Sequence, residues 1–374
     1  RMLNSVKTIT DLIVVNDTGS TDGTQELIRK FGLENNIPTY VFERPFDDFE
    51  KSRNFAMQKL RDVVKDLEWD SNKTHGYWID CDENLVIENN FNKEQFVNDL
   101  YMMNVYIGQM KYTRNTFFKV SKPFRWYGPV HEFIVCDEKN ITSGLAENLL
   151  VNVQMDGASW QGKTSEKYLD HAHRLENYIS NDRSDPRWIF YTAQSYHDSA
   201  SILDNRDENE ERLRRSLRYY RERTERSDGY PEEVYYSHFR IGTIMRNLEE
   251  PWNLTLQECL KAYSVDSSRG ESIKTIIDHY LQIGEWSLAY LYSKFAIETF
   301  HGKNPYPKRL LFVDEALYTW KFAESHAACC FYTNRKEEAK ESFLKILKIS
   351  KESPQSFNVD DLNKIETNSK FFLS

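Results

Sequence analysis

The hydrophobic pattern of the chain changes near residue 160. Before that point, short runs of β-forming residues alternate with stretches of helical periodicity. From Lys163 onward apolar residues recur at spacings of three and four, and the strand signal nearly vanishes. The sequence therefore predicts an α/β domain over residues 1–160, followed by an all-helical domain over residues 161–374.

The first domain is expected to begin with a regular alternation of elements. We predict strand, helix, strand, helix and strand over residues 12–16, 24–31, 39–43, 51–66 and 77–80. This order favours a mostly parallel sheet flanked by helices, as in Rossmann-like folds. Further strand-like runs at 117–120, 133–136 and 149–153 have no long helix between them, so we expect a mixed sheet at the end of the domain.

The second domain is expected to consist of helices joined by short turns. Candidate breaks lie near 184–186, 228–231, 250–253, Gly284 and 304–307. Two segments resemble each other: 283–286 leading into 289–297, and 332–335 leading into 339–347. Each places a turn between paired helices with small residues at the contact, which predicts tetratricopeptide-like helical hairpins; an irregular helical domain is the alternative.

Charge and hydropathy exclude two classes of partner. The net charge is −9, without the basic surface that binds nucleic-acid phosphates, and no stretch approaches the roughly 20 apolar residues that span a bilayer. One arginine-rich segment is interleaved with glutamates at helical spacings, which predicts a solvated helix face with internal ion pairs. Its arginines are Arg212, Arg214, Arg215, Arg218, Arg221, Arg223 and Arg226.

Cysteine usage and sequons bear on the compartment. The five cysteines are odd in number and lack metal-ligand spacing, so we expect free thiols and no disulfides. Four sequons occur, and the one at Asn16 lies inside a motif where a glycan would block function. With no signal peptide in the sequence, these features favour a cytoplasmic protein, with peripheral membrane association left open.

The first candidate motif covers residues 14–24. A hydrophobic strand delivers Asp17 at its end, small polar residues turn the chain, and Thr24 begins a helix. Ligands of open α/β sheets bind at this strand edge, where Asp17 could accept a hydrogen bond from a base or ribose and Asp22 could brace the turn. The same residues resemble the active-site loop of aspartic proteases, but the chain has no second such loop and the strand–helix alternation is wrong for that all-β fold.

A second motif ends another hydrophobic strand with Asp80-Cys81-Asp82-Glu83. If Asp80 turns toward sugar hydroxyls, Asp82 can hold Mg²⁺ or Mn²⁺, which needs few protein carboxylates when phosphates complete its shell. The nucleophile loop of haloacid-dehalogenase-like phosphatases is a rival. Those loops normally carry Thr or Val where this chain has Asn84, and they lie near the start of the domain.

Two further segments carry chemistry. At 124–132 an aromatic turn presents His131 beside Glu132; the imidazole could be a metal ligand and the carboxylate a general base. At 46–54 a loop enters a helix, where Arg53 could bind a diphosphate through its guanidinium or form a salt bridge with Asp48.

Taken in order, the four elements resemble family 2 glycosyltransferases of the GT-A fold, in the branch with tetratricopeptide-like helices after the catalytic domain. The matching residues are D-T-G-S-T-D-G-T at 17–24, D-D-F-x-x-x-R-N at 47–54, D-C-D-E at 80–83 and W-Y-G-P-V-H-E at 126–132. The resemblance is close over about residues 1–160 and loose beyond.

The resemblance implies an inverting, metal-dependent transfer of a sugar from a nucleotide-diphosphate sugar, usually a uridine diphosphate sugar, to a hydroxyl acceptor. It places Asp17, Arg53 and Asp80 in the donor site, Asp82 and His131 at a Mn²⁺ or Mg²⁺ ion, and Glu132 as the catalytic group. The roles of His131 and Glu132 could be exchanged. The acceptor, whether glycan, lipid or protein, is not identified, and the helical domain could make homo-oligomer contacts.

One departure from the family pattern leaves an alternative open. Family members begin with a strand that ends in a K-N-E-like segment, whereas this sequence starts within the helix that follows it. That strand helps to hold the nucleotide, so we expect either a trimmed chain or weakened donor binding. The alternative function is a helical-repeat interaction protein with a vestigial glycosyltransferase domain.

Overall fold

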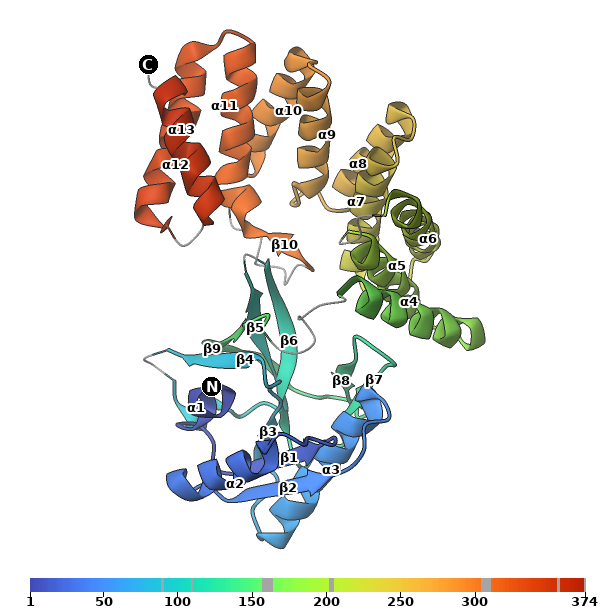
Figure 1. Ribbon diagram of the computed structural model, residues 1–374, viewed down its shortest axis with the longest axis vertical. Helices are drawn as coiled ribbons and strands as arrows, with labels where there is room; N and C mark the ends of the chain where they lie inside the picture. The colour runs from blue at the N-terminus through green and yellow to red at the C-terminus, as the bar shows by residue number, and fades with distance from the viewer. Residues whose placement is uncertain are drawn as a thin grey trace. The chain divides into compact units, whose positions relative to one another are not determined.

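The computed structural model describes residues 1–88, 91–108, 110–156, 164–201, 205–303, 311–354 and 357–372 (Figure 1). The chain divides into two compact units, Arg1–Gly108 with Tyr112–Thr164 and Gln109–Lys111 with Ser165–Ser374. The first is mixed α/β and the second is helical apart from one short strand. The two predicted structural classes are thus confirmed, while the predicted boundary between residues 160 and 161 lies outside the described residues.

The first unit contains three helices, a short 3₁₀ turn and nine strands within the described residues. In chain order they are α1 (Met2–Val6), β1 (Ile13–Asp17), α2 (Thr24–Asn35), β2 (Thr39–Glu43), α3 (Phe49–Asp66), β3 (His75–Tyr77), β4 (Glu83–Ile87), η1 (Lys93–Gln95), β5 (Leu100–Ile107), β6 (Met110–Lys119), β7 (Arg125–Tyr127), β8 (Phe133–Val135) and β9 (Ser143–Val153).

These strands form three hydrogen-bonded groups rather than one sheet. β1 pairs in parallel with β2, and β7 pairs antiparallel with β8. The largest group has the order β6-β5-β9-β4, with β3 antiparallel to β6, β4 antiparallel to β9, and β5 parallel to β9. The predicted mixed sheet is confirmed, but the expectation of a mostly parallel sheet containing residues 77–80 is wrong.

Asp80 is outside the sheet because the chain turns after the end of β3. Its ladder pairing stops at Tyr77, and the backbone of Asp80 is taken up by a turn: Asp80 N–H donates to the Glu83 carboxylate at 3.1 Å, and Glu83 N–H donates to the Asp80 carbonyl at 3.1 Å. A turn cannot continue a strand. Asp80 therefore lies beyond the sheet edge instead of on it.

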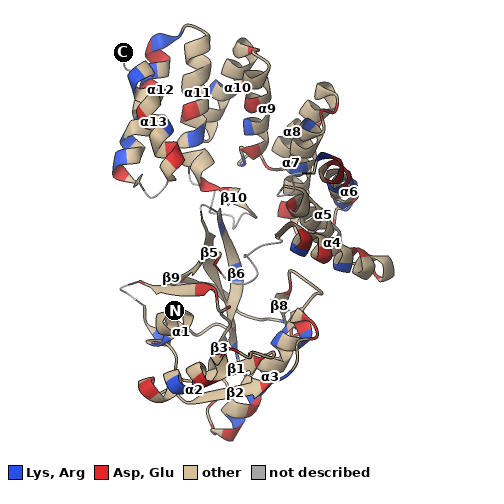
Figure 2. Ribbon diagram, in the orientation of Figure 1, with Lys and Arg blue, Asp and Glu red and all other residues tan. Residues whose placement is uncertain are grey.

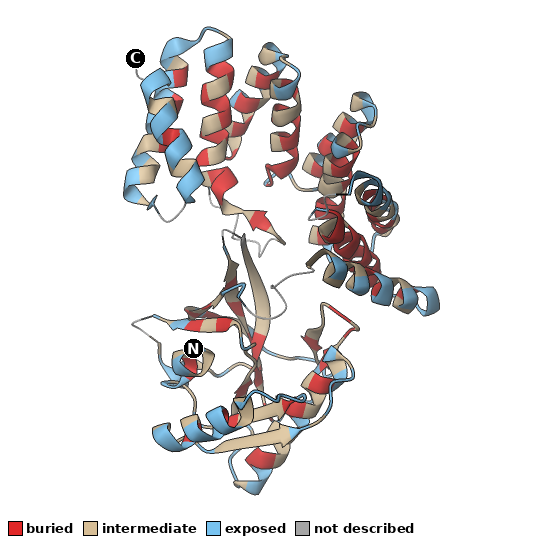
Figure 3. Cartoon of the chain, in the orientation of Figure 1, coloured by how far each residue is buried: buried red, intermediate tan, exposed pale blue. Residues whose placement is uncertain are grey.

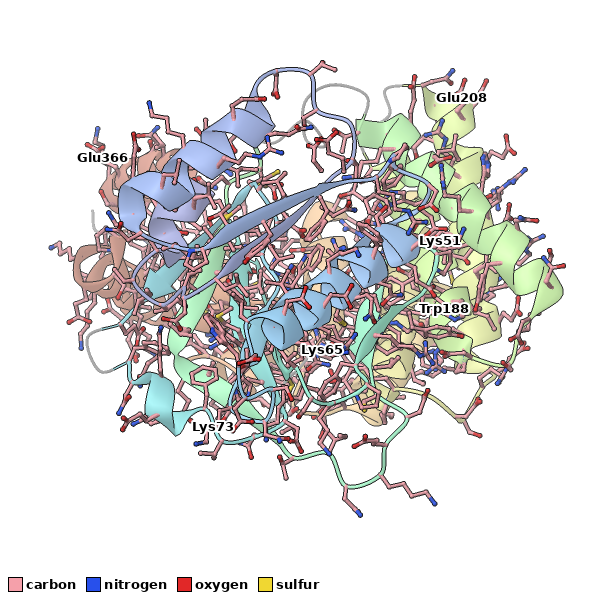
Figure 4. The ribbon with its side chains drawn as sticks, turned by 90° about the horizontal axis from the view of Figure 1, so that it is seen from below. Lys51, Lys65, Lys73, Trp188, Glu208 and Glu366 are labelled. Atoms are coloured by element: carbon pink, nitrogen blue, oxygen red, sulfur yellow. The ribbon has the colours of Figure 1, made fainter. Side chains whose placement is uncertain are left out.

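The core of the first unit forms where β5 and β9 pack their apolar residues against neighbouring elements. Met103, Val105 and Val151 are completely buried there. The helix α3 adds a second cluster through Met57, against rings that include Trp126. Figure 4 shows Lys51 and Lys65 near the two ends of α3. The helix thus has an apolar face toward the core and a charged face toward solvent.

The second unit contains the short strand β10 (Val313–Asp314), which pairs with Met110 and Lys111, and a set of helices. The helices are α4 (Thr164–Asn181), α5 (Pro186–Ala200), α6 (Arg206–Thr224), α7 (Pro231–Asn247), α8 (Trp252–Val265), α9 (Glu271–Gln282), α10 (Trp286–Thr299), a π-helical segment (Leu317–Lys321), α11 (Phe322–Tyr332), α12 (Lys336–Glu352) and α13 (Val359–Phe372). Figure 3 shows that buried residues run along α5, α9 and α11.

The helices form hairpins, as the two similar segments predict. Gly284 follows α9 and Asn334 follows α11, both with positive φ, at 77° and 58°. After each of them the chain turns directly into a new helix, α10 or α12, and the alanines Ala289 and Ala339 are buried there. The four predicted breaks within the described residues all separate helices, while the one at 304–307 lies outside them.

The arginine-rich segment is α6, whose ribbon carries both signs of charge in Figure 2. Arg214 pairs with Glu210 at 2.9 Å and Arg215 with Glu211 at 3.1 Å, so the predicted ion-paired surface is confirmed for these residues. It is wrong for Arg223, which is fully buried. Its guanidinium is held by Glu233 at 3.0 Å and by three backbone carbonyls, a partner set that lies in the next helix and loop.

All five cysteines are free thiols. Four tyrosines of the helical unit are buried: Tyr219, Tyr220, Tyr235 and Tyr236. Among the helices of the described chain, none is both long and apolar enough to cross a lipid bilayer.

Candidate functional site

The first two turns of α3 hold the aromatic turn at 124–132 in place. Asp48 caps the helix by accepting a hydrogen bond from Lys51 N–H at 2.6 Å. Glu50 accepts from Gly128 N–H at 2.8 Å. The Asn54 side chain donates to the Trp126 carbonyl at 2.9 Å and accepts from the Trp126 N–H at 2.8 Å, as a neighbouring strand would. Two of the four predicted motifs are thereby docked on each other.

Arg53 lies between Glu50 and Asn54 in the sequence, and its guanidinium contacts carboxylates of two other motifs. Its Nη2 lies 3.3 and 3.4 Å from the two carboxylate oxygens of Asp80, and its Nε lies 3.0 Å from Glu132 Oε1. The predicted alternative of a salt bridge to Asp48 is wrong, because Asp48 caps α3 and pairs with Lys51 at 2.7 Å. One guanidinium therefore joins three of the motifs.

Two indoles fix the position of that guanidinium. The Cζ atom of Arg53 lies 4.9 Å from the ring centre of Trp78 and 4.5 Å from that of Trp126. The Trp78 Nε1–H also donates to Asp80 Oδ1 at 2.9 Å. Cation–π contacts of this kind hold an arginine in place without consuming its N–H donors. Arg53 is thus held by two rings as well as by its two carboxylate partners.

Arg53 and its two carboxylate partners are only partly shielded from water. The exposed side-chain fraction is 17% for Arg53, 8% for Glu132 and 34% for Asp80. Solvent, or a ligand, can reach Asp80 and the edge of the guanidinium. An ion pair with this exposure costs less to separate than a fully buried one, because water can solvate the separated charges.

The first motif is anchored beside α3 through Asn16, whose side chain donates to the Ser52 carbonyl at 3.3 Å. Asp17 is buried at the end of β1, and its Oδ2 accepts from Gly19 N–H, Ser20 N–H and Gln25 Nε2 at 3.2, 3.0 and 2.8 Å. Hydrogen bonds, first from the Ser20 side chain, outweigh desolvation and hold the pKa of Asp17 below its usual range. The residue is an ionised carboxylate that also braces the turn.

Asp22 acts as predicted for a bracing residue. Its Oδ1 accepts from Thr24 N–H at 3.1 Å and from the Thr24 hydroxyl at 2.7 Å, at the start of α2. The side-chain bond from Thr24 lowers the pKa of Asp22. The positive φ of Gly23, 84°, is what lets the chain enter the helix at this point.

In the acidic motif, the last carboxylate is structural. Glu83 is buried and forms a bidentate pair with Arg114, with two N–O distances of 2.8 Å. Asp82 is half-buried, and its backbone carbonyl accepts from Gln154 N–H at 3.0 Å. His131 is also half-buried and has a positive φ of 54°, which only a tightly constrained turn imposes on a histidine.

The donor set can be tested against the predicted metal. Asp80 is committed to Arg53 and Trp78, so it is a poor metal ligand here. Asp82 and His131 offer one hard oxygen and one imidazole nitrogen, a set that suits Mn²⁺ more than Mg²⁺. In the described chain they belong to no group of three candidate ligands. A cation held by these two residues alone would need its further ligands from outside the protein, such as substrate phosphates and water.

Sequence reasoning missed the roles of Glu50, Asn54 and Trp78. Glu50 and Asn54 flank Arg53 at helical spacing, one turn before it and one residue after it, which is a signal that this end of α3 faces the same neighbour. Trp78 precedes Asp80 by two residues, but its partner Trp126 is distant in the sequence. Their ring centres lie 5.3 Å apart.

Part of the chain is distantly similar to known proteins. No protein-family model matches the chain. The SPbeta prophage-derived glycosyltransferase SunS of Bacillus subtilis (strain 168) and glycosyltransferase SunS of Bacillus phage SPbeta are each 24% identical to it over 235 residues. The alignment covers 59% of this chain and 50% of each relative, so the chain spans about half the length of the curated relatives it matches.

Solved structures were also compared. MamA has a TM-score of 0.36 at 10% identity, covering 53% of this chain and 98% of that chain. YrrB, a TPR protein, has a TM-score of 0.33 at 13% identity, covering 52% of this chain and 83% of that chain. Scores this low establish no common fold, so the helical hairpins stand on the helices described above.

Proposed function

We propose that the chain is an inverting glycosyltransferase that moves a sugar from a nucleotide-diphosphate donor, of which uridine diphosphate sugars are the first candidates, to a hydroxyl acceptor. One observation carries the proposal: Arg53, packed against the rings of both Trp78 and Trp126, joins Asp80 and Glu132. Motifs distant in the sequence thus converge on one partly exposed cation. The distant similarity to two glycosyltransferases supports the same chemistry.

Donor binding is assigned to Asp17, Arg53 and Asp80. Asp17, ionised at the end of β1, accepts hydrogen bonds from the nucleoside. The Arg53 guanidinium can exchange a carboxylate for a diphosphate oxygen, because phosphates are the bidentate acceptors that arginine matches best. The exchange leaves Asp80 available for hydroxyls of the ribose or the sugar.

The same exchange prepares Glu132 for catalysis. While Arg53 Nε donates to Glu132 at 3.0 Å, that carboxylate oxygen is occupied by the guanidinium. When the guanidinium turns to the diphosphate, Glu132 is released to accept the proton of the acceptor hydroxyl. The hydroxyl oxygen then forms its bond to the anomeric carbon as the bond to the diphosphate oxygen breaks.

Asp82 and His131 would hold a divalent ion, Mn²⁺ or Mg²⁺. Such an ion, when bound, neutralises charge on the departing diphosphate. Both side chains are half-buried, Asp82 directly before β4 and His131 at a position with positive φ, and in the sequence each is next to or near a residue that contacts Arg53.

The proposal is tested by donor hydrolysis and transfer in the presence of Mn²⁺, across a panel of nucleotide sugars. Asp82→Ala is expected to lower turnover at least about 100-fold. The matched control is Asp11→Ala, an aspartate of the same unit whose side chain is 69% exposed and pairs with Lys93; it is expected to keep full turnover. Equal turnover in the two variants would refute the assignment of Asp82.

The alternative, an interaction protein with a vestigial catalytic unit, makes the opposite prediction for binding. Calorimetry with nucleotide-sugar donors and Mn²⁺ would then give no heat for the unaltered chain. It would also give no difference between that chain and Arg53→Met. A donor signal that Arg53→Met removes excludes the alternative.

A further inference from the structure

A second cluster of chemistry lies in the helical unit, between α11 and α12. His326 and Cys330 are one turn apart on α11 and are 2% and 0% exposed. Glu338 lies in the first turn of α12, with 34% of its side chain exposed. One ligand atom from each residue lies within 4.8 Å of the other two. Figure 1 shows the two helices side by side, as their contacts also establish.

Histidine Nε2 is the centre of this cluster. It lies 3.2 Å from Glu338 Oε1 and 3.4 Å from Cys330 Sγ. Tetrahedral zinc with ordinary bond lengths places ligand nitrogen and oxygen about 3.3 Å apart, and nitrogen and sulfur about 3.6 Å apart. The observed separations are close to those of a zinc site and need only small side-chain shifts.

The other ring nitrogen of His326 also has an oxygen neighbour. The Ser293 hydroxyl oxygen lies 3.0 Å from the Tyr290 carbonyl and 3.0 Å from His326 Nδ1. In the tautomer in which Nδ1–H donates to this hydroxyl, Nε2 presents a lone pair toward Glu338 and Cys330, which is the form that binds a metal ion.

The surroundings are those of a supported metal site. Metal-binding histidines usually donate their second N–H to a protein oxygen, as His326 does to Ser293 in that tautomer. The Tyr290 hydroxyl lies 3.1 and 3.0 Å from the two oxygens of Glu338 and holds that carboxylate in place. Because Glu338 is partly exposed, an ion can enter and a water can be the fourth ligand.

We propose that His326, Cys330 and Glu338 bind one zinc ion, which joins α11 to α12. The residues are a soft sulfur, an imidazole and one carboxylate, a set that favours Zn²⁺ over Mg²⁺ or Mn²⁺. On binding, the sulfur–metal bond forms and the thiol proton leaves to solvent. The site shares no residue with the proposed Asp82 and His131 site, and of the two it alone contains a thiol.

The test uses the full chain with the exposed Cys81 replaced (Cys81→Ser), freed of metal and titrated with Co²⁺. Coordination by Cys330 is expected to give thiolate-to-cobalt absorption in the near ultraviolet, which one equivalent of Zn²⁺ abolishes. Oxygen ligands at Asp82 cannot produce that band. Cys330→Ser should remove it, whereas the control Cys259→Ser, another buried thiol of the helical unit, should retain it.

A second variant covers the case in which Cys330→Ser does not fold. Glu338→Gln changes a partly exposed side chain and is expected to weaken zinc binding at least about tenfold, with the far-ultraviolet circular dichroism unchanged. The proposal is overturned if the near-ultraviolet band is missing from the unaltered cluster. It is equally overturned if the zinc affinity is the same with Glu338→Gln; the cluster would then be a hydrogen-bond network around an imidazolium.

Discussion

Both units of this protein bury an arginine among carboxylates and aromatic rings, but at different depths. In the helical unit Arg269 is 0% exposed, pairs with Glu271 at 2.7 Å and Glu232 at 3.0 Å, and lies over the ring of Tyr235 with Cζ 4.4 Å from its centre. In the α/β unit Arg53 has the same kinds of neighbours but is 17% exposed.

The difference in depth separates a structural pair from an exchangeable one. Arg269 also donates to the carbonyls of Leu311 and Phe312, at 2.7 and 3.3 Å, so its donors are satisfied by groups that cannot leave. A buried pair of this kind is costly to break, because water cannot solvate the charge that remains. Around Arg53, Asp80 is 34% exposed and can be hydrated when its partner leaves. The same chemistry thus serves folding in one unit and ligand exchange in the other.

The largest expected effect comes from breaking the structural pair. Arg269→Met leaves Glu271 buried without its cation, and we expect the free energy of unfolding to fall by about 3–5 kcal/mol. Urea unfolding followed by circular dichroism measures it. Arg214→Met, at a pair whose side chains are 51% and 49% exposed, is the matched control and should change stability by less than about 0.5 kcal/mol. Equal costs would remove the distinction by depth.

Breaking the exchangeable pair should affect function more than folding. Arg53→Met keeps an apolar stem between the two indoles but loses the charge, so donor turnover is expected to fall at least 100-fold, about 2.7 kcal/mol. Stability should fall by less than in Arg269→Met, because Asp80 is 34% exposed and can be hydrated, although Glu132, at 8% exposed, also loses its partner. Steady-state kinetics and urea unfolding on the same preparation measure both. A stability loss as large as that of Arg269→Met would make Arg53 a structural residue.

Sequence patterns predicted the two structural classes and the hairpin turns because those features depend on local periodicity. Gly284 is an example: a glycine after one helical run and before the next indicates a turn wherever it occurs. The four motifs were also found in the sequence, because each follows a strand or begins a helix. Arg53, Asp80 and Glu132 are among the residues these motifs contain, and the structure brings them into contact; their roles in a donor site stay a prediction.

What the sequence could not predict was which charges meet. Arg53 and Asp80 are 27 positions apart, and nothing local indicates that the guanidinium bridges Asp80 and Glu132. For Arg223, the local pattern predicts the wrong environment. By spacing it belongs to an ion-paired surface helix, but Glu233 and three carbonyls of the following loop bury it. Tertiary contacts decide both cases.

As the pH is lowered, we expect the helical unit to lose stability before the α/β unit does. Burial lowers the pKa of His171, in α4, to about 4, so the folded helical unit favours the neutral ring. That stability is complete above the unfolded pKa near 6.5 and is lost as the pH falls toward 4, at about 2 kcal/mol between pH 7 and 4.5. In the α/β unit burial would raise the pKa of Asp99, but hydrogen bonds from Lys119 and Thr142 lower it to about 2, so its contribution lasts to lower pH.

Hydrogen exchange measured by mass spectrometry resolves the two units as the pH is lowered. The helical unit is expected to lose protection first, near pH 5. Burial also lowers the pKa of other histidines of the helical unit, among them His197 and His301. His171→Leu removes one of these groups and should reduce the pH dependence of that unit without affecting the α/β unit. The hypothesis fails if the slope of stability against pH is the same with leucine at position 171.

The smallest expected effect on stability comes from removing a helix cap, and two caps can be compared. Asp48 accepts from Lys51 N–H at the start of α3, and Asn205 accepts from Asp207 N–H at 3.1 Å at the start of α6. Each alanine substitution should cost about 1 kcal/mol of stability. Only Asp48→Ala should also raise the donor KM, by a few fold, because the turns it caps carry Glu50 and Arg53. If both variants keep the same KM, the first turns of α3 position nothing that the donor contacts, and the exposed pair around Arg53 is a surface feature.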